Sequence, residues 1–265
     1  MKKRGIHKLQ ELAHLGKADL HIHSNYSDGR PTIEEILDFV ENKTDLDVIA
    51  ICDHDTIAGA LKASEIVSKK KYRFEVIVGE EVSTTDGHIL GLFLKKQISK
   101  GVTAHTALKK IREQGGIAIV PHPFENMRMR LPNHLTMDGV GLITLLREKK
   151  LIHAIEIINA TPTLGEENLR ASFINRTLLL KAETGSSDAH ILEGIGKAYT
   201  LFEGDTASEL RHALAYHQTR AVYGKWTLAA YTKYLFFFIP IGIRMAFYTL
   251  LHGRLERKPQ ITNFE

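Results

Sequence analysis

The sequence predicts an α/β protein whose mostly parallel sheet closes into a barrel. Short apolar runs of strand character alternate with segments of helical periodicity, which is typical of strands connected by helices. About seven or eight such units in roughly 200 residues favour a barrel. An open, doubly wound sheet is the alternative. The chain lacks both glycine-rich nucleotide-binding motifs that would support that alternative.

The apolar runs and the helical periodicity locate the expected elements along the chain. The predicted strands cover residues 18–23, 46–52, 75–78, 88–94, 116–120, 153–158, 182–186 and 198–202. The predicted helices are the segment that follows Pro31 and residues 57–68, 103–114, 136–148, 166–180 and 207–217. The second, third and fifth of these helices are expected to connect successive strands in the β-α-β manner.

Short signals mark the ends of several predicted helices. Three T-x-x-E capping boxes predict helix starts: Thr32 with Glu35, Thr163 with Glu166, and Thr206 with Glu209. The pair Gly115-Gly116 predicts the end of the third helix, because glycine adopts the left-handed backbone of a C-cap without strain.

Composition and charge limit the class of protein. The 265 residues carry a formal net charge of +4, with a sequence pI of about 9.0. This excess suits a phosphate-bearing substrate or an anionic membrane surface, but it is too small to argue for nucleic acid alone. The single cysteine, Cys52, excludes an internal disulfide and favours a reducing compartment. Residues 1–17 have no long apolar run, so we expect no signal peptide and a cytoplasmic protein.

We expect three regions along the chain: an N-terminal extension (1–16), one domain (17–225) and an apolar, basic tail (226–265). The apolar stretch 234–243 is too short to span a bilayer, which needs about 20 residues. Extending it to residue 251 gives the length but takes in Arg244, and Pro240 and Gly242 are expected to interrupt the helix.

The tail, residues 231–258, therefore has two expected roles. It contacts a membrane surface peripherally, which would make the protein membrane-associated, or it packs on the barrel or on a second subunit. In the first case three basic residues would face acidic headgroups: Arg254, Arg257 and Lys258. The oligomeric state stays open.

The first predicted strand carries two histidines, His21 and His23. Residues two apart on a strand point to the same face, so the two imidazoles can hold one metal ion. Such a pair is weak evidence by itself in a chain with 14 histidines.

Other histidine and acidic residues stand at the boundaries of later strands. They are Asp28, Asp53-His54-Asp55, Glu80-Glu81, His88, His122, Asp188 and His190. In a parallel barrel the carboxyl ends of all strands gather at one face, so we expect a common site. Imidazole with carboxylate suits Zn, Mn or Fe, and the absence of thiolates argues against a closed structural zinc site. A carboxylate such as Glu81 can bridge two ions, which together would clamp a phosphoryl group.

Seven motifs in order resemble those of the PHP family of metal-dependent phosphoesterases. They are D-L-H-I-H-S (19–24), S-D-G (27–29), D-H-D (53–55), G-E-E-V-S (79–83), G-H-I-L-G-L (87–92), P-H-P-F (121–124) and S-D-A-H (187–190). The resemblance covers about residues 17–225. It implies a distorted TIM-like barrel of about seven strands and two to three divalent ions. The short connection between Leu94 and Gly101 resembles the compact form of the family, which lacks an inserted domain.

The resemblance also implies a role for each ligand. The first metal would be held by His21, His23, Glu81 and Asp188. Glu81 would bridge to a second metal completed by His88 and His122. Asp28, His54 and His190 would hold a third. Glu81 is preferred over Glu80 because it is the last acidic residue before V-S, and strand neighbours point to opposite faces.

Supporting residues are expected around these ligands. At least one of Asp53 and Asp55 would orient an imidazole, and Asp19 would do the same or turn to solvent. Arginine matches phosphate geometry, so the candidate phosphate-binding residues are Arg30, Arg128 and Arg130, with plain solvent exposure as the alternative.

The function expected from these residues is metal-dependent hydrolysis of a phosphate ester. Glu81, Asp188, His54 and His190 would be catalytic, and a metal-activated water would attack a phosphomonoester such as a nucleotide or sugar phosphate. An exonuclease or phosphodiesterase acting on short oligonucleotides is the alternative, disfavoured because no aromatic and basic stripe is evident. There are two other hypotheses. One is a non-catalytic, metal-stabilised binding module at the membrane, and the other is a metal-dependent amide or deaminating hydrolase.

Overall fold

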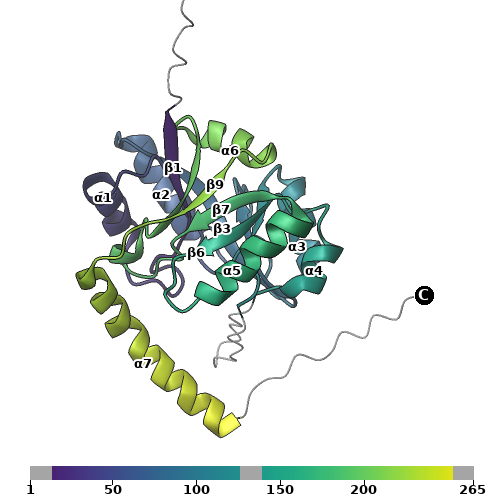
Figure 1. Ribbon diagram of the computed structural model, residues 1–265. Helices are drawn as coiled ribbons and strands as arrows, with labels where there is room; N and C mark the ends of the chain where they lie inside the picture. Colours follow the sequence, from purple (N-terminus) through teal and green to yellow (C-terminus); the bar gives the residue numbers. More distant parts are fainter. Residues whose placement is uncertain (1–13, 126–138, 253–265) are drawn as a thin grey trace, which may run out of the picture.

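The structure is a computed structural model, and it describes residues 14–125 and 139–252 (Figure 1). Its strands are β1 (Leu15–Ile22), β2 (Val48–Ile51), β3 (Glu75–Thr84), β4 (Gly87–Leu92), β5 (Ile117–Val120), β6 (Ala154–Asn159), β7 (Ala182–Ser186), β8 (Ala198–Glu203) and β9 (Arg220–Tyr223). Its α-helices are α1 (Ile33–Lys43), α2 (Ala58–Lys69), α3 (Ala104–Glu113), α4 (Gly141–Arg147), α5 (Gly165–Ile174), α6 (Ala207–Ala215) and α7 (Leu228–His252). A π-helical turn, Asn175–Leu179, extends α5, and a 3₁₀ turn, Leu192–Gly194, follows β7.

The strands form one sheet in the order β7-β6-β5-β4-β3-β2-β1-β8-β9. The expectation of a mostly parallel sheet is wrong, because β4 and β8 run antiparallel to both of their neighbours. For the same reason α3 connects two antiparallel strands, whereas α2 and α5 make the β-α-β connections that were predicted. Within the described residues the sheet has nine strands, whereas the resemblance implied about seven and the sequence pattern predicted eight; β9 is the strand that was not predicted.

The two ends of the sheet meet and make it a nearly closed barrel, as predicted. The N–H of Gly185 in β7 donates to Oγ1 of Thr200 in β8 at 3.1 Å, and that hydroxyl donates back to the Gly185 carbonyl at 2.9 Å. Thr219, just before β9, donates to the Glu183 carbonyl at 2.8 Å. A side chain at Gly185 would place its Cβ 2.7 Å from the Tyr199 carbonyl oxygen, so glycine permits this close approach.

Apolar side chains fill the barrel, and helices cover its outside (Figure 1). Leu20 and Phe202 from the strands pack with Leu210 and Leu214 of α6. The buried stripe of α1, which includes Ile36 and Val40, packs with α2 against β1 and β2. Because this packing fixes the strands, the loops at their carboxyl ends are held in place.

Two of the three predicted capping boxes are confirmed. The Thr32 and Thr206 side chains both accept the expected backbone N–H, and Glu35 and Glu209 complete the boxes. The third box, at Thr163, is wrong: α5 begins after Leu164 and has no side-chain cap. Gly115 ends α3 with a φ of +74°, as the sequence predicted.

Only the first turns of α7 pack on the barrel, while the rest extends away from it (Figure 1). Tyr234 and Phe237 are buried against Ile191, and Trp226 and Phe238 complete this cluster. In the part of the chain that the structure describes, no helix has both the length and the apolar character needed to cross a membrane. Residues 253–265, with the basic end of the predicted tail, lie outside the described part.

Candidate metal centre

The structure gathers all nine predicted ligands at one end of the barrel. His21 is in β1, Glu81 in β3 and His88 in β4, and the others stand in the segments that follow strands. They make four groups in which the ligand atoms lie within 4.8 Å of one another. The groups are His21 with His23 and Glu81; His54 with Glu81 and His88; His21 with His122 and Asp188; and His23 with Asp28, His54 and His190.

Glu81 lies at the centre of the cluster, and its two oxygens face different imidazoles. Oε2 lies 3.1 Å from Nε2 of His21 and 3.3 Å from Nε2 of His23. Oε1 lies 3.0 Å from Nδ1 of His88 and 3.1 Å from Nε2 of His122. Its neighbour Glu80 points away, and its Oε2 accepts the Ile98 N–H at 2.8 Å.

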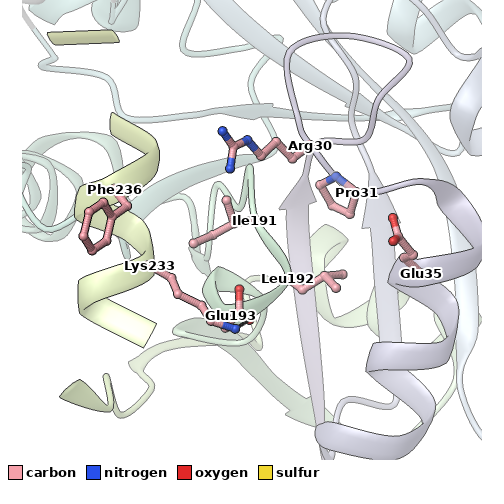
Figure 2. A pocket seen from close by; sticks show the side chains of 8 residues that line it. All are labelled: Arg30, Pro31, Glu35, Ile191, Leu192, Glu193, Lys233 and Phe236. Atoms are coloured by element: carbon pink, nitrogen blue, oxygen red, sulfur yellow. Dashed lines mark hydrogen bonds and ion pairs between the residues drawn. The ribbon is translucent and has the colours of Figure 1, made fainter. Parts of the chain in front are cut away.

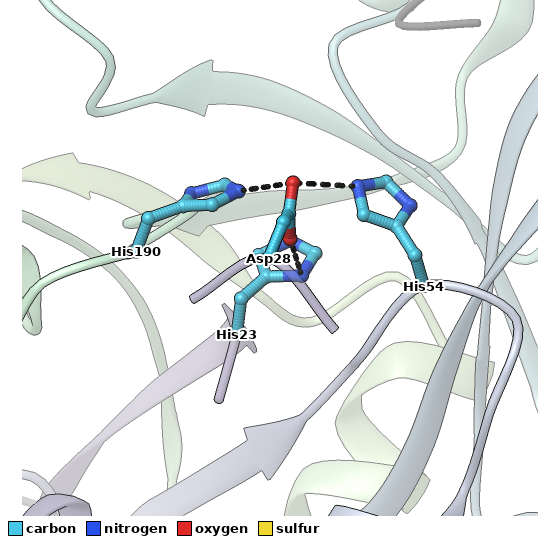
Figure 3. A group of neighbouring side chains, drawn as sticks. All are labelled: His23, Asp28, His54 and His190. Carbon is cyan, nitrogen blue, oxygen red and sulfur yellow. Dashed lines mark ion pairs between the residues drawn. The ribbon is translucent and has the colours of Figure 1, made fainter. Parts of the chain in front are cut away.

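A second carboxylate, that of Asp28, is 36% exposed and faces three imidazoles (Figure 3). Its Oδ2 lies 3.3 Å from Nε2 of His190 and 3.7 Å from Nε2 of His54. Its Oδ1 lies 3.6 Å from Nδ1 of His23. His23 thus faces Glu81 through Nε2 and Asp28 through Nδ1, so it touches two groups of ligands.

The third carboxylate, that of Asp188, closes the cluster on the β7 side. Its Oδ1 lies 3.2 Å from Nε2 of His23 and 3.5 Å from Nε2 of His21. The backbone φ is +51° at Asp188 and +25° at His122, in the left-handed region that residues other than glycine rarely adopt. Backbone strain of this kind concentrates at functional sites.

The ligand set fits divalent metal ions by its chemistry and by what it leaves unpaired. Several buried imidazole nitrogens make no well-directed hydrogen bond within the described residues, although all but Nε2 of His88 face a carboxylate: Nδ1 of His23, His54 and His122, both ring nitrogens of His88, and Nε2 of His190. An unpaired buried polar atom is costly, whereas a lone pair directed at a shared point suits a metal. Cys52 is buried, as the sequence predicted, and its Sγ–H donates to the Leu20 carbonyl rather than facing the cluster.

Opposed charges dominate the electrostatics of the site. Burial lowers the pKa of an imidazole, but the facing carboxylates of Asp188 and Glu81 raise the pKa of His23 to about 10. Glu125 and Glu81 outweigh burial in the same way and raise the pKa of His122 to about 10. The imidazoles in turn hold the pKa of Glu81 and Asp188 well below the usual carboxyl range, although burial opposes this.

Three residues that the sequence analysis missed hold the ligands in place. Glu156 in β6 accepts from Nδ1 of His21 at 3.2 Å, which directs Nε2 of that imidazole at Glu81. Asn159 donates to Glu156 at 2.9 Å and to Oδ2 of Asp188 at 3.1 Å. Glu125 lies 3.0 Å from Nδ1 of His122. Charged and amide residues in the apolar run A-I-E-I-I-N were the signal available in the sequence.

The three predicted supporting aspartates hold backbone and serine groups rather than imidazoles. Asp53 accepts from the Ser24 N–H and hydroxyl and from the Ser27 hydroxyl, each at 2.7 Å, and so fixes the loop that carries Asp28. Asp55 accepts the Ser83 N–H at 2.8 Å.

Asp19 is fully buried, so its predicted alternative of facing solvent is wrong. It accepts the N–H of Ser187 at 2.9 Å and that of Gly196 at 2.8 Å, and burial raises its pKa to about 6.

The predicted phosphate-binding arginines are only partly described. Arg30 is exposed beside the cluster, its backbone N–H donates to the His190 carbonyl at 2.9 Å, and its guanidinium lies 5.0 Å from the centre of the Phe237 ring. Arg128 and Arg130 lie outside the described residues.

Comparisons with known proteins agree with this site. A family model described as PHP-associated matches residues 165–219. The uncharacterized protein MJ1587 of Methanocaldococcus jannaschii is 36% identical over 154 residues, which are 53% of this chain and 89% of that protein. A 5'-3' exoribonuclease of Haemophilus influenzae is 36% identical over 107 residues, 39% of this chain and 38% of the enzyme.

A solved structure shares the fold. It is a two-domain protein of Bacteroides vulgatus that is described as containing a predicted PHP-like metal-dependent phosphoesterase. The two structures align with a TM-score of 0.57 and 20% sequence identity. The alignment covers 84% of this chain and 69% of that one. The barrel, the full set of motif ligands around Glu81 and these matches lead to one assignment: the chain belongs to the PHP family of metal-dependent phosphoesterases.

Proposed function

We propose that this phosphoesterase hydrolyses a small phosphomonoester, such as a nucleotide or a sugar phosphate, with two to three bound ions of Mn, Fe or Zn. The observation that carries the proposal is the arrangement around Glu81, whose two oxygens divide the imidazoles into two sets. Membership of the family implies divalent metal cofactors and a phosphorylated substrate. We propose the number of ions, their identity and the kind of ester.

The distances support the following assignment of ligands. Oε2 of Glu81 would serve a first metal with His21, His23 and Asp188, and Oε1 would serve a second with His88 and His122. Asp28, His54 and His190 would hold a third, and Nδ1 of His23 is near enough to join them.

Within this assignment each catalytic residue has a task. When bound, the ions supply an activated water and neutralise charge on the phosphate oxygens. Glu81 and Asp188 would hold the ions: the imidazoles fix both carboxylates, and Asn159 donates a further hydrogen bond to Asp188. Nε2 of His54 and Nε2 of His190 face Asp28, and with it they would hold a third ion, which would neutralise charge on the leaving oxygen.

The experiment that tests this proposal combines metal content with turnover. We expect two or three ions per chain by elemental analysis, and release of phosphate from an aryl phosphomonoester that requires Mn, Fe or Zn. Replacing Glu81→Gln should abolish turnover and remove bound metal, while the matched Glu80→Gln variant, whose carboxylate faces Ile98, keeps both. Full activity of a metal-loaded Glu81→Gln protein would contradict the assignment.

A phosphodiesterase acting on short oligonucleotides is the second candidate. It is kept because the Haemophilus influenzae relative is named an exoribonuclease, and because Arg30 and aromatic residues of α7 lie beside His190. A bis-aryl phosphodiester and a short RNA, assayed beside the aryl phosphomonoester and AMP, separate the two. Turnover of the diester and the RNA alone would replace the first candidate.

A further inference from the structure

The distal part of α7 exposes large apolar side chains. Phe236 is 74% exposed, Ile243 66%, Phe247 63% and Leu250 81%. By contrast, Tyr234 and Phe237, which are one or two residues from Phe236 in the sequence, are buried on the barrel. A contiguous apolar surface of this kind marks a contact with something other than water.

Five of the exposed apolar residues lie on one face of the helix. They follow the helical spacing of three and four residues, so their side chains form a stripe: Phe236, Ile239, Ile243, Phe247 and Leu250. At about 1.5 Å per residue the stripe is about 21 Å long. It therefore forms an extended surface rather than a single contact.

Charge along the same region favours an anionic partner. The sequence contains no acidic residue from Arg211 to Leu255, whereas it contains Lys225 and Arg244. Arg244 is exposed beside the stripe. Trp226 and Tyr231, amphipathic rings typical of membrane interfaces, stand at the start of the helix.

These features fit a lipid surface better than a second copy of this chain. A second copy laid along the stripe would bring basic residues together, and α7 has no carboxylate to pair with them. Anionic headgroups would pair with those cations while the acyl boundary takes up the apolar side chains.

The stripe begins beside the metal centre. Phe236 also lines a pocket of about 430 Å³ with Arg30, Ile191 and Lys233 (Figure 2). On the inner face of the same helix turn, the Phe238 ring stands edge-on to the His190 imidazole with centroids 5.8 Å apart. The stripe and the ring that contacts His190 therefore lie on opposite faces of the first turns of α7.

We propose that α7 lies in the plane of an anionic membrane surface, bound through the stripe Phe236 to Leu250, with the barrel held on the opposite face of its first turns.

The test is sedimentation of the full-length, metal-loaded protein with vesicles. We expect binding to vesicles of phosphatidylcholine with phosphatidylglycerol, weak binding to phosphatidylcholine alone, and a loss of binding at high salt. Trp226 is the chain's single tryptophan. Brominated lipid should therefore quench the fluorescence of this one reporter at the helix start.

Substitution of the stripe supplies the matched comparison. A triple variant, Ile239→Gln, Ile243→Gln and Phe247→Gln, avoids the pocket and the metal centre and should bind vesicles about a hundredfold more weakly. Its hydrolysis of a soluble aryl phosphate and its circular dichroism should equal those of the wild type. The control is Leu169→Gln with Phe173→Gln, which removes two comparably exposed apolar side chains from α5 and should bind like the wild type.

Three results would overturn the proposal. They are failure of the wild type to bind anionic vesicles, equal binding by the triple variant, and a vesicle-independent oligomer that the triple variant converts to monomer. The last would assign the stripe to a second copy. Because binding is read without turnover, none of these results bears on the proposed reaction.

Discussion

The residues around His21 show how a single imidazole is prepared for a metal. Its Nδ1–H donates to Glu156, so Nε2 is the ring nitrogen that faces Glu81 and would bind a metal. The other oxygen of Glu156 accepts the His122 N–H at 2.9 Å, so one carboxylate positions two ligands. Such partners of metal ligands commonly affect metal affinity as strongly as the ligands' own geometry does.

Replacing Glu156→Gln should weaken metal binding about 10- to 100-fold. Glutamine keeps the size, but one of its two terminal groups becomes a donor that cannot accept from His122 or Asn159. Competition with a chelating dye measures the affinity. The control is Glu183→Gln, which removes a carboxylate paired with Arg176 away from the site and should leave affinity unchanged. Equal affinities in both variants would contradict the role given to Glu156.

Metal uptake should release protons at pH 7. In the metal-free protein His23 and His122 have a pKa of about 10 and are charged, whereas a metal ligand must be neutral. Affinity should therefore rise as pH rises toward 10, by about tenfold per unit for each proton displaced. Titration calorimetry in two buffers of different ionisation enthalpy measures the released protons, and identical heats in both buffers would refute the prediction.

The ligands themselves could be predicted from the sequence, whereas the residues that hydrogen-bond to them could not. Ligand side chains stand at strand boundaries in recognisable motifs, and the choice of Glu81 over Glu80 followed from the alternation of a strand. Glu156 lies within an apolar strand, and its meaning depends on His21, which is 135 residues away. A local sequence pattern cannot predict a contact between residues so far apart in the chain.

At the scale of elements, helix starts were predictable where a side chain could close a cap. The boxes at α1 and α6 formed, whereas at α5 the chain starts its helix at Gly165, so Thr163 caps nothing. A T-x-x-E pattern alone does not show which turn the chain adopts before the helix.

Replacing Thr206→Ala should lower the free energy of unfolding by about 1 kcal/mol, because it removes the acceptor for the Glu209 N–H. The same change at Thr163 is the matched control and should have little effect. Urea denaturation of both chelator-treated variants measures the difference. An equal loss in the two variants would mean that the threonines act through something other than capping.

The hairpin of β3 and β4 was the main element the sequence analysis misread. The motif G-E-E-V-S drew attention to its carboxylates, but the strand continues through it to Thr84 and turns back at Gly87, whose φ is +128°. This turn pairs Ser83 with His88 and so places His88 beside Glu81. Predicting the antiparallel pairing required recognising the turn as a hairpin.

At the scale of the whole molecule, the barrel was predictable because it follows from the number of alternating units. The strand count and direction were not, since β9 is short and partly exposed and β4 reverses the sheet. Closure depends on contacts such as Gly185 with Thr200, which no local pattern encodes. The orientation of α7 depends on contacts of its first turns with Arg30, His190, Ile191 and Glu193.

Removing the ions should destabilise the whole barrel, because the ligands come from strands all around it. An ion at a thousand times its dissociation constant stabilises the folded state by about 4 kcal/mol. We expect the thermal midpoint to fall after chelation and to recover on reloading. The Glu81→Gln protein should show a smaller difference between the thermal midpoints with and without ions. A midpoint that does not change on chelation would argue against ligation by several strands.

The hydrogen bonds of Asp19 also bear on how this protein is made. They join the first strand to Ser187 and Gly196, and His21 cannot meet Asp188 until that junction forms. During synthesis the amino-terminal histidines leave the ribosome long before their last partners. A nascent chain that has reached only β6 presents an incomplete chelate, so acquiring the full complement of ions belongs to the closing stage of biogenesis.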